Sequence, residues 1–141
     1  MTATPKPPAT PAVTVVSPDG FPRARGYSNG IVAEGRTLHV AGQVGWESDG
    51  TFATDDMARQ FGRALDHVLA VVAAAGGAPE RIVSMTVYVT DLDAYVAARH
   101  ELGPIWRQRL GRHYPAMALV EVKRLLEPRA RVEIQAVAVL A

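Results

Sequence analysis

The chain has 141 residues, one domain's worth of sequence and enough to bury a single hydrophobic core. Hydrophobic residues make up 48% and charged residues 21%, and the net charge of +1 gives no electrostatic reason to expect nucleic acid or an acidic membrane surface as a partner. The absence of cysteine excludes disulfides, thiolate nucleophiles and thiolate zinc sites, and no apolar run is long enough to cross a bilayer, so we expect a cytoplasmic protein without membrane association.

Residues 1–18 are rich in Pro, Thr and Ala and predict a flexible tail ahead of one domain over residues 19–141. The tail has no continuous apolar segment of the kind that a secretory signal carries. Residues 13–16 are a short β-prone island inside it, which leaves open an added edge strand.

The first half of the domain predicts a hairpin and then a helix. Residues 31–33 and 37–44 are β-prone runs joined by a turn candidate at 34–36. After the capping candidates of residues 54–56, apolar side chains at three- and four-residue spacing predict an amphipathic helix of about five turns, formed around Met57, Phe61, Ala64, Leu65, Val68, Leu69 and Val72. The double glycine at 76–77 ends it.

The second half predicts a strand, a helix and two further strands. Residues 82–89 form the first of these strands, and Asp91-Leu92-Asp93 caps a helix over about residues 94–110, in which Gly103–Pro104 must start, kink or interrupt a part. A terminal strand pair, 116–122 and 131–140, closes the chain. The order β-β-α-β-α-β-β predicts an α+β subunit with two helices on one face of a sheet. The uncovered apolar face would need burial, for which trimerisation is one route.

The last strand carries the first candidate for chemistry. Val132, Ile134 and Ala136 alternate with polar residues, as in a strand with one face on a core. Glu133 lies in the middle of the polar set. Spacing alone leaves two possibilities open, a solvated sheet face or the lining of a pocket.

Several segments in matching order resemble the RidA/YjgF family over roughly residues 26–139. They are Tyr27-Ser-Asn-Gly, Ala41-Gly-Gln, the Gln60 to Asp91 run, Tyr114-Pro-Ala, Val120-Glu-Val-Lys-Arg-Leu and Val132-Glu-Ile-Gln-Ala-Val-Ala. The resemblance implies a chorismate-mutase-like subunit in a homotrimer with small-molecule pockets between subunits. It also implies cofactor-free hydrolysis of reactive enamines and imines, such as 2-aminoacrylate, to ketoacids and ammonia.

The resemblance assigns roles to single residues. Glu133 matches the carboxylate that positions the attacking water, and Tyr27 matches a pocket tyrosine. Gly42 and Gln43 belong to a matching motif, and Gly42 permits close backbone approach. Where the deaminases carry an arginine that clamps the substrate carboxylate, this chain has Met117. Methionine cannot form the bidentate ion pair of a guanidinium, so we expect a different, more apolar substrate.

A replacement for the lost charge is available on the second helix, where Arg99 and His100 stand near the position of a family asparagine. Two rival functions stay open: a trimer that binds a metabolite without catalysis, favoured by Met117, and an RNA-binding protein or ribonuclease. For the latter, the arginines of the C-terminal third carry few interleaved aromatic residues, so a solvated surface is favoured and nucleic acid is not expected. The histidines show no metal-ligand spacing, and we expect no metal.

Overall fold

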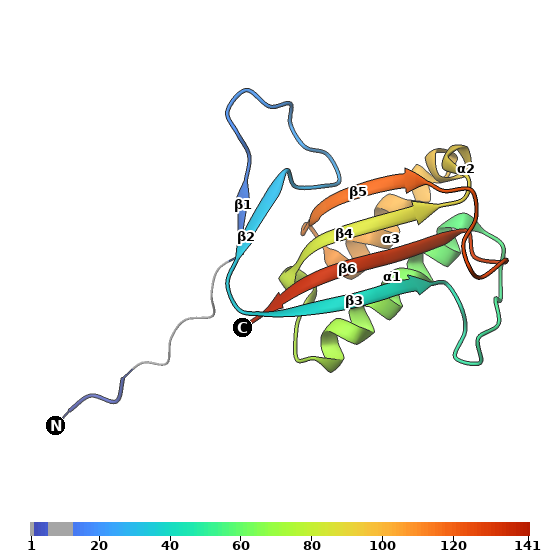
Figure 1. Cartoon of the computed structure of the whole chain (residues 1–141). Helices are drawn as coiled ribbons and strands as arrows, with labels where there is room; N and C mark the ends of the chain where they lie inside the picture. Colours follow the sequence, from blue (N-terminus) through green and yellow to red (C-terminus); the bar gives the residue numbers. More distant parts are fainter. Residues whose placement is uncertain (1, 6–12) are drawn as a thin grey trace.

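The computed structural model describes residues 2–5 and 13–141, and its centre is a mixed four-stranded sheet with helices on one side. Figure 1 shows the helices behind the strands and a two-stranded ribbon projecting from one end. The strand order is β3-β6-β4-β5, with β4 and β5 parallel and the other neighbours antiparallel. The strands are β3 (Arg36–Val44), β4 (Ile82–Val89), β5 (Ala116–Glu121) and β6 (Val132–Leu140). The predicted α+β class is confirmed.

The predicted hairpin of residues 31–33 with 37–44 is wrong. The first run becomes β2 (Gly30–Ala33), which pairs with β1 (Val13–Val16), while β3 pairs with β6. The β-branched island of the tail therefore satisfies the hydrogen-bonding edge of β2, and β3 gains the longer ladder along β6. Met1 and residues 6–12 of the predicted tail lie outside the described residues.

The first predicted helix is confirmed as α1 (Met57–Ala74). The Asp56 side chain accepts a 3.0 Å hydrogen bond from the backbone N–H of Arg59, which caps the helix. A short 3-10 turn, η1 (Pro79–Arg81), leads into β4. No helix of residues 2–5 and 13–141 is long and apolar enough to span a membrane.

The second predicted helix is divided into α2 (Leu92–Ala97) and α3 (Arg99–Leu110). Asp91 caps it as predicted, with a 2.9 Å bond from the Ala94 N–H. The break lies at Ala98. Gly103–Pro104 does not interrupt the helix, and Pro104 lies inside α3. The turn at Ala98 brings one side of α3 onto the core, and that side presents Leu102, Trp106 and Leu110.

The terminal strands do not pair with each other, because β4 lies between them. β5 returns parallel to β4 after the α2–α3 crossover, as parallel pairing requires, and β6 then takes the other edge of β4. This arrangement decides which side chains of the C-terminal third become neighbours.

The helix-covered face of the sheet holds the core. Val132, Ile134 and Ala136 are buried there, as their alternation predicts, and β4 adds apolar side chains to the same layer. A smaller cluster of Val44, Phe52 and Ala130, with Trp46 packed against it, lies apart from this core.

Gln60 is the one polar side chain that is fully buried in α1, and it joins three segments. Its amide nitrogen donates to the carbonyls of Thr54 at 2.9 Å and Arg129 at 3.1 Å, and its oxygen accepts from the Arg131 N–H at 2.8 Å. Gln60 therefore fixes the start of β6, immediately before Glu133, against α1.

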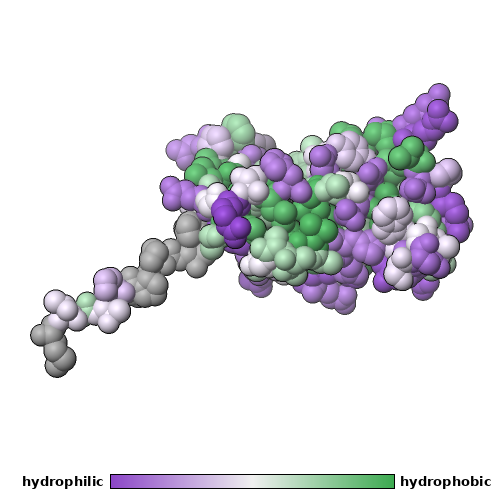
Figure 2. All heavy atoms as spheres, turned by 60° about the horizontal axis from the view of Figure 1, so that its bottom comes forward, coloured by the Kyte–Doolittle hydropathy of each residue, from purple (hydrophilic) through white to green (hydrophobic). Residues whose placement is uncertain are grey.

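The other face of the sheet carries no helix (Figure 1). Glu133, Gln135 and Val137 of β6 alternate with the core residues and point to this face, where none of them is fully buried. Figure 2 shows apolar side chains gathered in one area beside the end that bears the ribbon and the tail. A gathered apolar area of this kind is typical of a surface that meets a partner.

Candidate functional site

Glu133 lies on β6 against the neighbouring strand β3, and Gly42 leaves the space that its side chain occupies. A Cβ placed on Gly42 would lie only 2.1 Å from the Glu133 Oε1. The register of β3 along β6 shifts between Val40 and Gln43, so Gly42 lies in an irregular part of the ladder. Within the described part of the chain the Glu133 carboxylate makes no hydrogen bond or ion pair, which leaves both of its oxygens available to a water or ligand.

Tyr27 and Met117 form a second group of predicted residues. Both line a hollow of about 330 Å³ at the start of β4 and β5, together with Ser84 and Thr86. Tyr27 is 41% exposed, and Met117 is half-buried against the core. The structure thus brings these two residues together at the sheet edge that β5 forms.

Ser28 holds Tyr27 in place beside β5. Its hydroxyl donates to the Tyr114 carbonyl and its N–H donates to the Pro115 carbonyl at 2.9 Å, and Ser28 is buried. No role in the site was predicted for this serine from the sequence. Its signal was its place directly after Tyr27 in the matched Tyr-Ser-Asn-Gly segment.

Arg99 lies with Met117 in another cavity, also of about 330 Å³, between the helices and the start of β5. His100 lines a separate groove beside α1, together with Asp55 and Arg131. Of the two candidates for the missing positive charge, Arg99 therefore shares a cavity lining with Met117, and His100 does not.

Gln43 lies near Gly42 on β3, and its side-chain amide donates to the Ala41 carbonyl at 3.3 Å. Among the described residues, Gly42, Gln43 and Glu133 line neither the hollow that contains Tyr27 nor the cavity that contains Arg99. β4 lies between the two strands that carry Met117 and Glu133.

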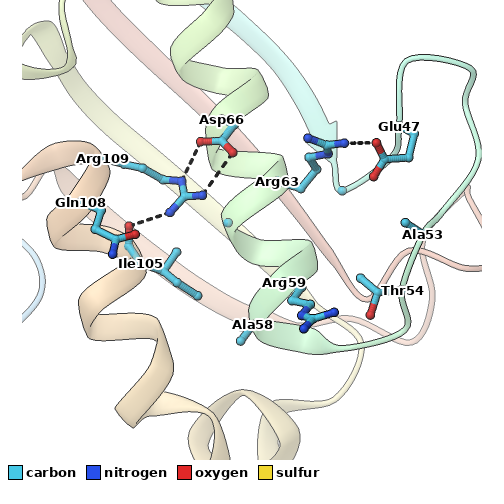
Figure 3. A pocket seen from close by; sticks show the side chains of 12 residues that line it. Glu47, Ala53, Thr54, Ala58, Arg59, Arg63, Asp66, Ile105, Gln108 and Arg109 are labelled. Carbon is cyan, nitrogen blue, oxygen red and sulfur yellow. Dashed lines mark hydrogen bonds and ion pairs between the residues drawn. The ribbon is translucent and has the colours of Figure 1, made fainter.

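A groove of about 410 Å³ between α1 and α3 contains none of the predicted residues (Figure 3). Arg63 forms an ion pair with Glu47 at its edge, and Arg109 holds Asp66 with bonds of 2.6 and 3.2 Å. Figure 3 shows that these acidic partners face the arginines across the groove, so most of its charge is compensated internally.

Three arginines of the basic C-terminal third are similarly compensated. Arg109 pairs with Asp66, Arg129 with Asp55 at 2.8 Å, and Arg131 with Asp91 at 3.6 Å. These arginines therefore do not combine into an uncompensated basic surface of the kind that nucleic-acid-binding domains present. Among residues 2–5 and 13–141 no group of three or more histidine, aspartate or glutamate side chains is arranged to hold a metal ion.

Comparison with known proteins gives three consistent results. The family model described as "Endoribonuclease L-PSP" matches residues 20–140. A RutC family protein of Pasteurella multocida is 32% identical over 90% of this chain and 98% of its own, and the human 2-iminobutanoate/2-iminopropanoate deaminase is 29% identical over 89% and 88%. The crystal structure of the Rid family protein YyfB from Yersinia pestis superposes with a TM-score of 0.82 at 28% identity, over 91% of this chain and 98% of that one.

Proposed function

Because the chain belongs to the RidA/YjgF/L-PSP family, we propose that it is a cofactor-free hydrolase acting on an imine, an enamine or a related small unsaturated metabolite. The human relative's name describes an imine deaminase, and the proposal extends that reaction class to this chain. A cytoplasmic location is part of the same proposal.

The observation that carries the proposal is the Glu133 carboxylate. It projects from the start of β6 over Gly42, whose missing side chain leaves room for it, and it has no internal partner in the described residues. A carboxylate held in this way can accept a hydrogen bond from a water molecule and take its proton. The rest of the chain then needs only to bring the C=N carbon of a substrate to that water.

The proposed reaction is a hydrolysis. The water oxygen attacks the C=N carbon while Glu133 accepts one water proton, and the nitrogen of the substrate takes up a proton from solvent to give a carbinolamine. Glu133 then passes its proton to the nitrogen, and the C–N bond breaks as the hydroxyl group releases its proton to solvent, which yields ammonia and the carbonyl product. The sum is R₂C=NH + H₂O → R₂C=O + NH₃, and Glu133 is regenerated.

We further propose that the working site lies between subunits of a homotrimer. Tyr27 and Met117 stand at one edge of the sheet and Glu133 stands across β4 from them, so one chain supplies two incomplete halves. The helix-free face of the sheet and the gathered apolar surface support a second copy as the partner (Figure 2). In such an assembly, Glu133 of one subunit faces Tyr27 and Met117 of its neighbour.

Met117 supports a substrate other than the 2-aminoacrylate type. Its thioether has no charge with which to hold a carboxylate, and it borders a cavity with a mainly apolar lining. The same residue favours a second candidate function, a trimer that binds a metabolite in this site without turning it over. RNA binding has less support, because Arg109, Arg129 and Arg131 of the C-terminal third are ion-paired.

The proposal is tested by following the loss of enzymatically generated 2-iminopropanoate and of longer-chain imines beside a buffer blank. We expect Glu133→Gln to lower the hydrolysis rate by about 10²–10⁴-fold, the range for loss of a general base. Glu121→Gln is the matched control, because Glu121 is an exposed carboxylate on β5 outside the candidate site. Full activity of Glu133→Gln would contradict the proposal.

Met117→Arg separates the two candidate functions. Activity on 2-iminopropanoate in this variant alone would show that the water-holding half of the site works and that the natural substrate belongs to another class. Absence of hydrolysis in both proteins with every imine tested would favour the non-catalytic binding trimer.

A further inference from the structure

The cavity behind Met117 is lined by aromatic rings from four segments of the chain. Trp106 of α3 stacks on Tyr114, with ring centroids 5.8 Å apart and an interplanar angle of 2°, and Phe61 of α1 meets Tyr95 of α2 edge to face at 6.1 Å. Trp106 is fixed by a 3.1 Å hydrogen bond from its indole nitrogen to the His113 carbonyl. The cavity has a volume of about 330 Å³, which lies within the range of small-molecule sites, roughly 300–1,000 Å³.

Two arginines stand on the exposed part of this lining. Arg25 comes from the loop between β1 and β2, and Arg99 begins α3. Arg25 makes no hydrogen bond or ion pair with any other described residue. Arg99 uses only its Nε, which donates to the Val96 carbonyl at 3.3 Å, so its terminal nitrogens are available. Two guanidinium groups beside an apolar cavity match a ligand with an anionic end and an apolar body.

Tyr95 adds one polar group within the aromatic lining. Burial raises the pKa of its phenol, so the hydroxyl keeps its proton at neutral pH and can act as a hydrogen-bond donor. Among the described residues this hydroxyl has no hydrogen-bond partner.

We propose that this cavity takes an aromatic carboxylate, with the ring between the side chains of Trp106 and Phe61 and the carboxylate on Arg25 and Arg99. The proposal rests on the proposed function in one respect, since it names the substrate class of the site that Met117 borders. Met117 lines both this cavity and the hollow that contains Tyr27. Met117 lies opposite Met85 of the core and packs on the helix-covered face, so its side chain borders this cavity, and Arg99 takes over the charge that Met117 lacks.

The test measures binding and not turnover, with three stable probes and calorimetry on the full chain. The probes are 3-phenylpropanoate, which has ring and charge, propanoate, which has only the charge, and 3-phenylpropan-1-ol, which has only the ring. We expect 3-phenylpropanoate to bind at least about tenfold more tightly than either of the others, because each of them lacks one of the two contacts. If propanoate or 3-phenylpropan-1-ol bound as tightly as 3-phenylpropanoate, the assignment would be overturned.

Variants locate the carboxylate. Arg99→Gln and Arg25→Gln should each weaken binding of 3-phenylpropanoate by about tenfold or more, the loss expected for a charge-assisted hydrogen bond. Arg112→Gln is the matched control, because Arg112 is exposed and lies outside the lining of the cavity. The assignment to Arg25 and Arg99 would be overturned if Arg112→Gln lost as much affinity as the other two variants. It would also be overturned if none of the three variants lost affinity.

The fluorescence of Trp106 tests where the ring of 3-phenylpropanoate binds. Trp46 and Trp106 are the two tryptophans of the chain, so the Trp46→Phe protein reports Trp106 alone by its fluorescence. We expect 3-phenylpropanoate to change that emission with the same concentration dependence as the calorimetric signal, and an unchanged emission at saturation would place the ring elsewhere.

Binding and hydrolysis can fail separately. Tight binding of 3-phenylpropanoate without hydrolysis of any imine would sustain the cavity assignment and remove the proposed catalysis. Hydrolysis of small imines without binding of 3-phenylpropanoate would sustain the proposed catalysis and remove the cavity assignment.

Discussion

The two faces of the sheet share the same strands and differ in almost everything else. On the helix-covered face, Ile134 of β6 is fully buried among apolar side chains, whereas Glu133 and Gln135, its neighbours in sequence, point away from the helices and stay accessible. The covered face has its packing partners within the chain. The helix-free face has uncommitted groups, among them the Glu133 carboxylate. Stability is therefore expected to depend mainly on one face, and the chemistry and assembly of the protein on the other.

The largest expected effect comes from a change on the covered face. Ile134→Ala should lower the free energy of unfolding by about 2–5 kcal/mol, because it removes a fully buried side chain and leaves a cavity. Gln135→Ala, one position along β6 on the other face, should change it by about 0.5 kcal/mol or less. Urea denaturation of the two variants beside the parent protein measures the difference. Equal losses would contradict the division between the faces.

Gln60→Leu tests the connection between α1 and the start of β6. Leucine keeps most of the side-chain volume and removes the hydrogen bonds to Thr54, Arg129 and Arg131, which leaves buried backbone groups without partners. We expect a loss of about 3 kcal/mol or more in the free energy of unfolding, since three backbone groups lose their partner and each costs at least about 1 kcal/mol.

Hydrogen exchange distinguishes this effect from a general loss of stability. Faster exchange of the Arg131 amide, relative to amides in the middle of β4, is the local effect that the loss of its Gln60 partner predicts. Uniform acceleration across the sheet would show that Gln60 has no special connection to β6.

A small effect on stability is expected at Gly42, where the effect on activity should be large. An alanine Cβ would overlap the Glu133 carboxylate, which is the free end of a flexible side chain and can move aside. We therefore expect Gly42→Ala to change the unfolding free energy by about 1 kcal/mol or less. Displacement of the carboxylate should lower imine hydrolysis by about 100-fold, the scale of a 1 Å misplacement of a reacting group.

Thermal unfolding and the imine assay on the same preparation give the two numbers. Gly45→Ala is an instructive comparison, because a Cβ there would meet the backbone of Gln60 at 2.7 Å, which cannot move aside as a side chain can. That variant should lose stability. Retained hydrolysis in a well-folded Gly42→Ala protein would show that the position of Glu133 over Gly42 has no part in catalysis.

Much of the candidate site could be found from sequence, but its arrangement could not. Glu133 stood out because its strand alternates, and Tyr27, Gly42 and Met117 stood out because they lie in segments that resemble a family. Nothing in the sequence showed which of Arg99 and His100 would lie in the cavity with Met117. Adjacent residues of a helix point in different directions, and only the packing of the helix decides which of them meets a given cavity. In the folded chain, Arg99 lines the same cavity as Met117, and His100 lines a separate groove with Asp55.

By itself, the sequence determined the elements whose signals are local. The spacing of apolar residues and the Asp56 cap gave α1, and alternation gave the buried side of β6, because helix and strand periodicity need only neighbouring residues. Only the tertiary structure decided that β2 pairs with β1, that β4 separates β5 from β6, and that Gln60 joins α1 to β6. These outcomes depend on which distant segment offers the better ladder or the buried partner, and that competition leaves no pattern in adjacent residues.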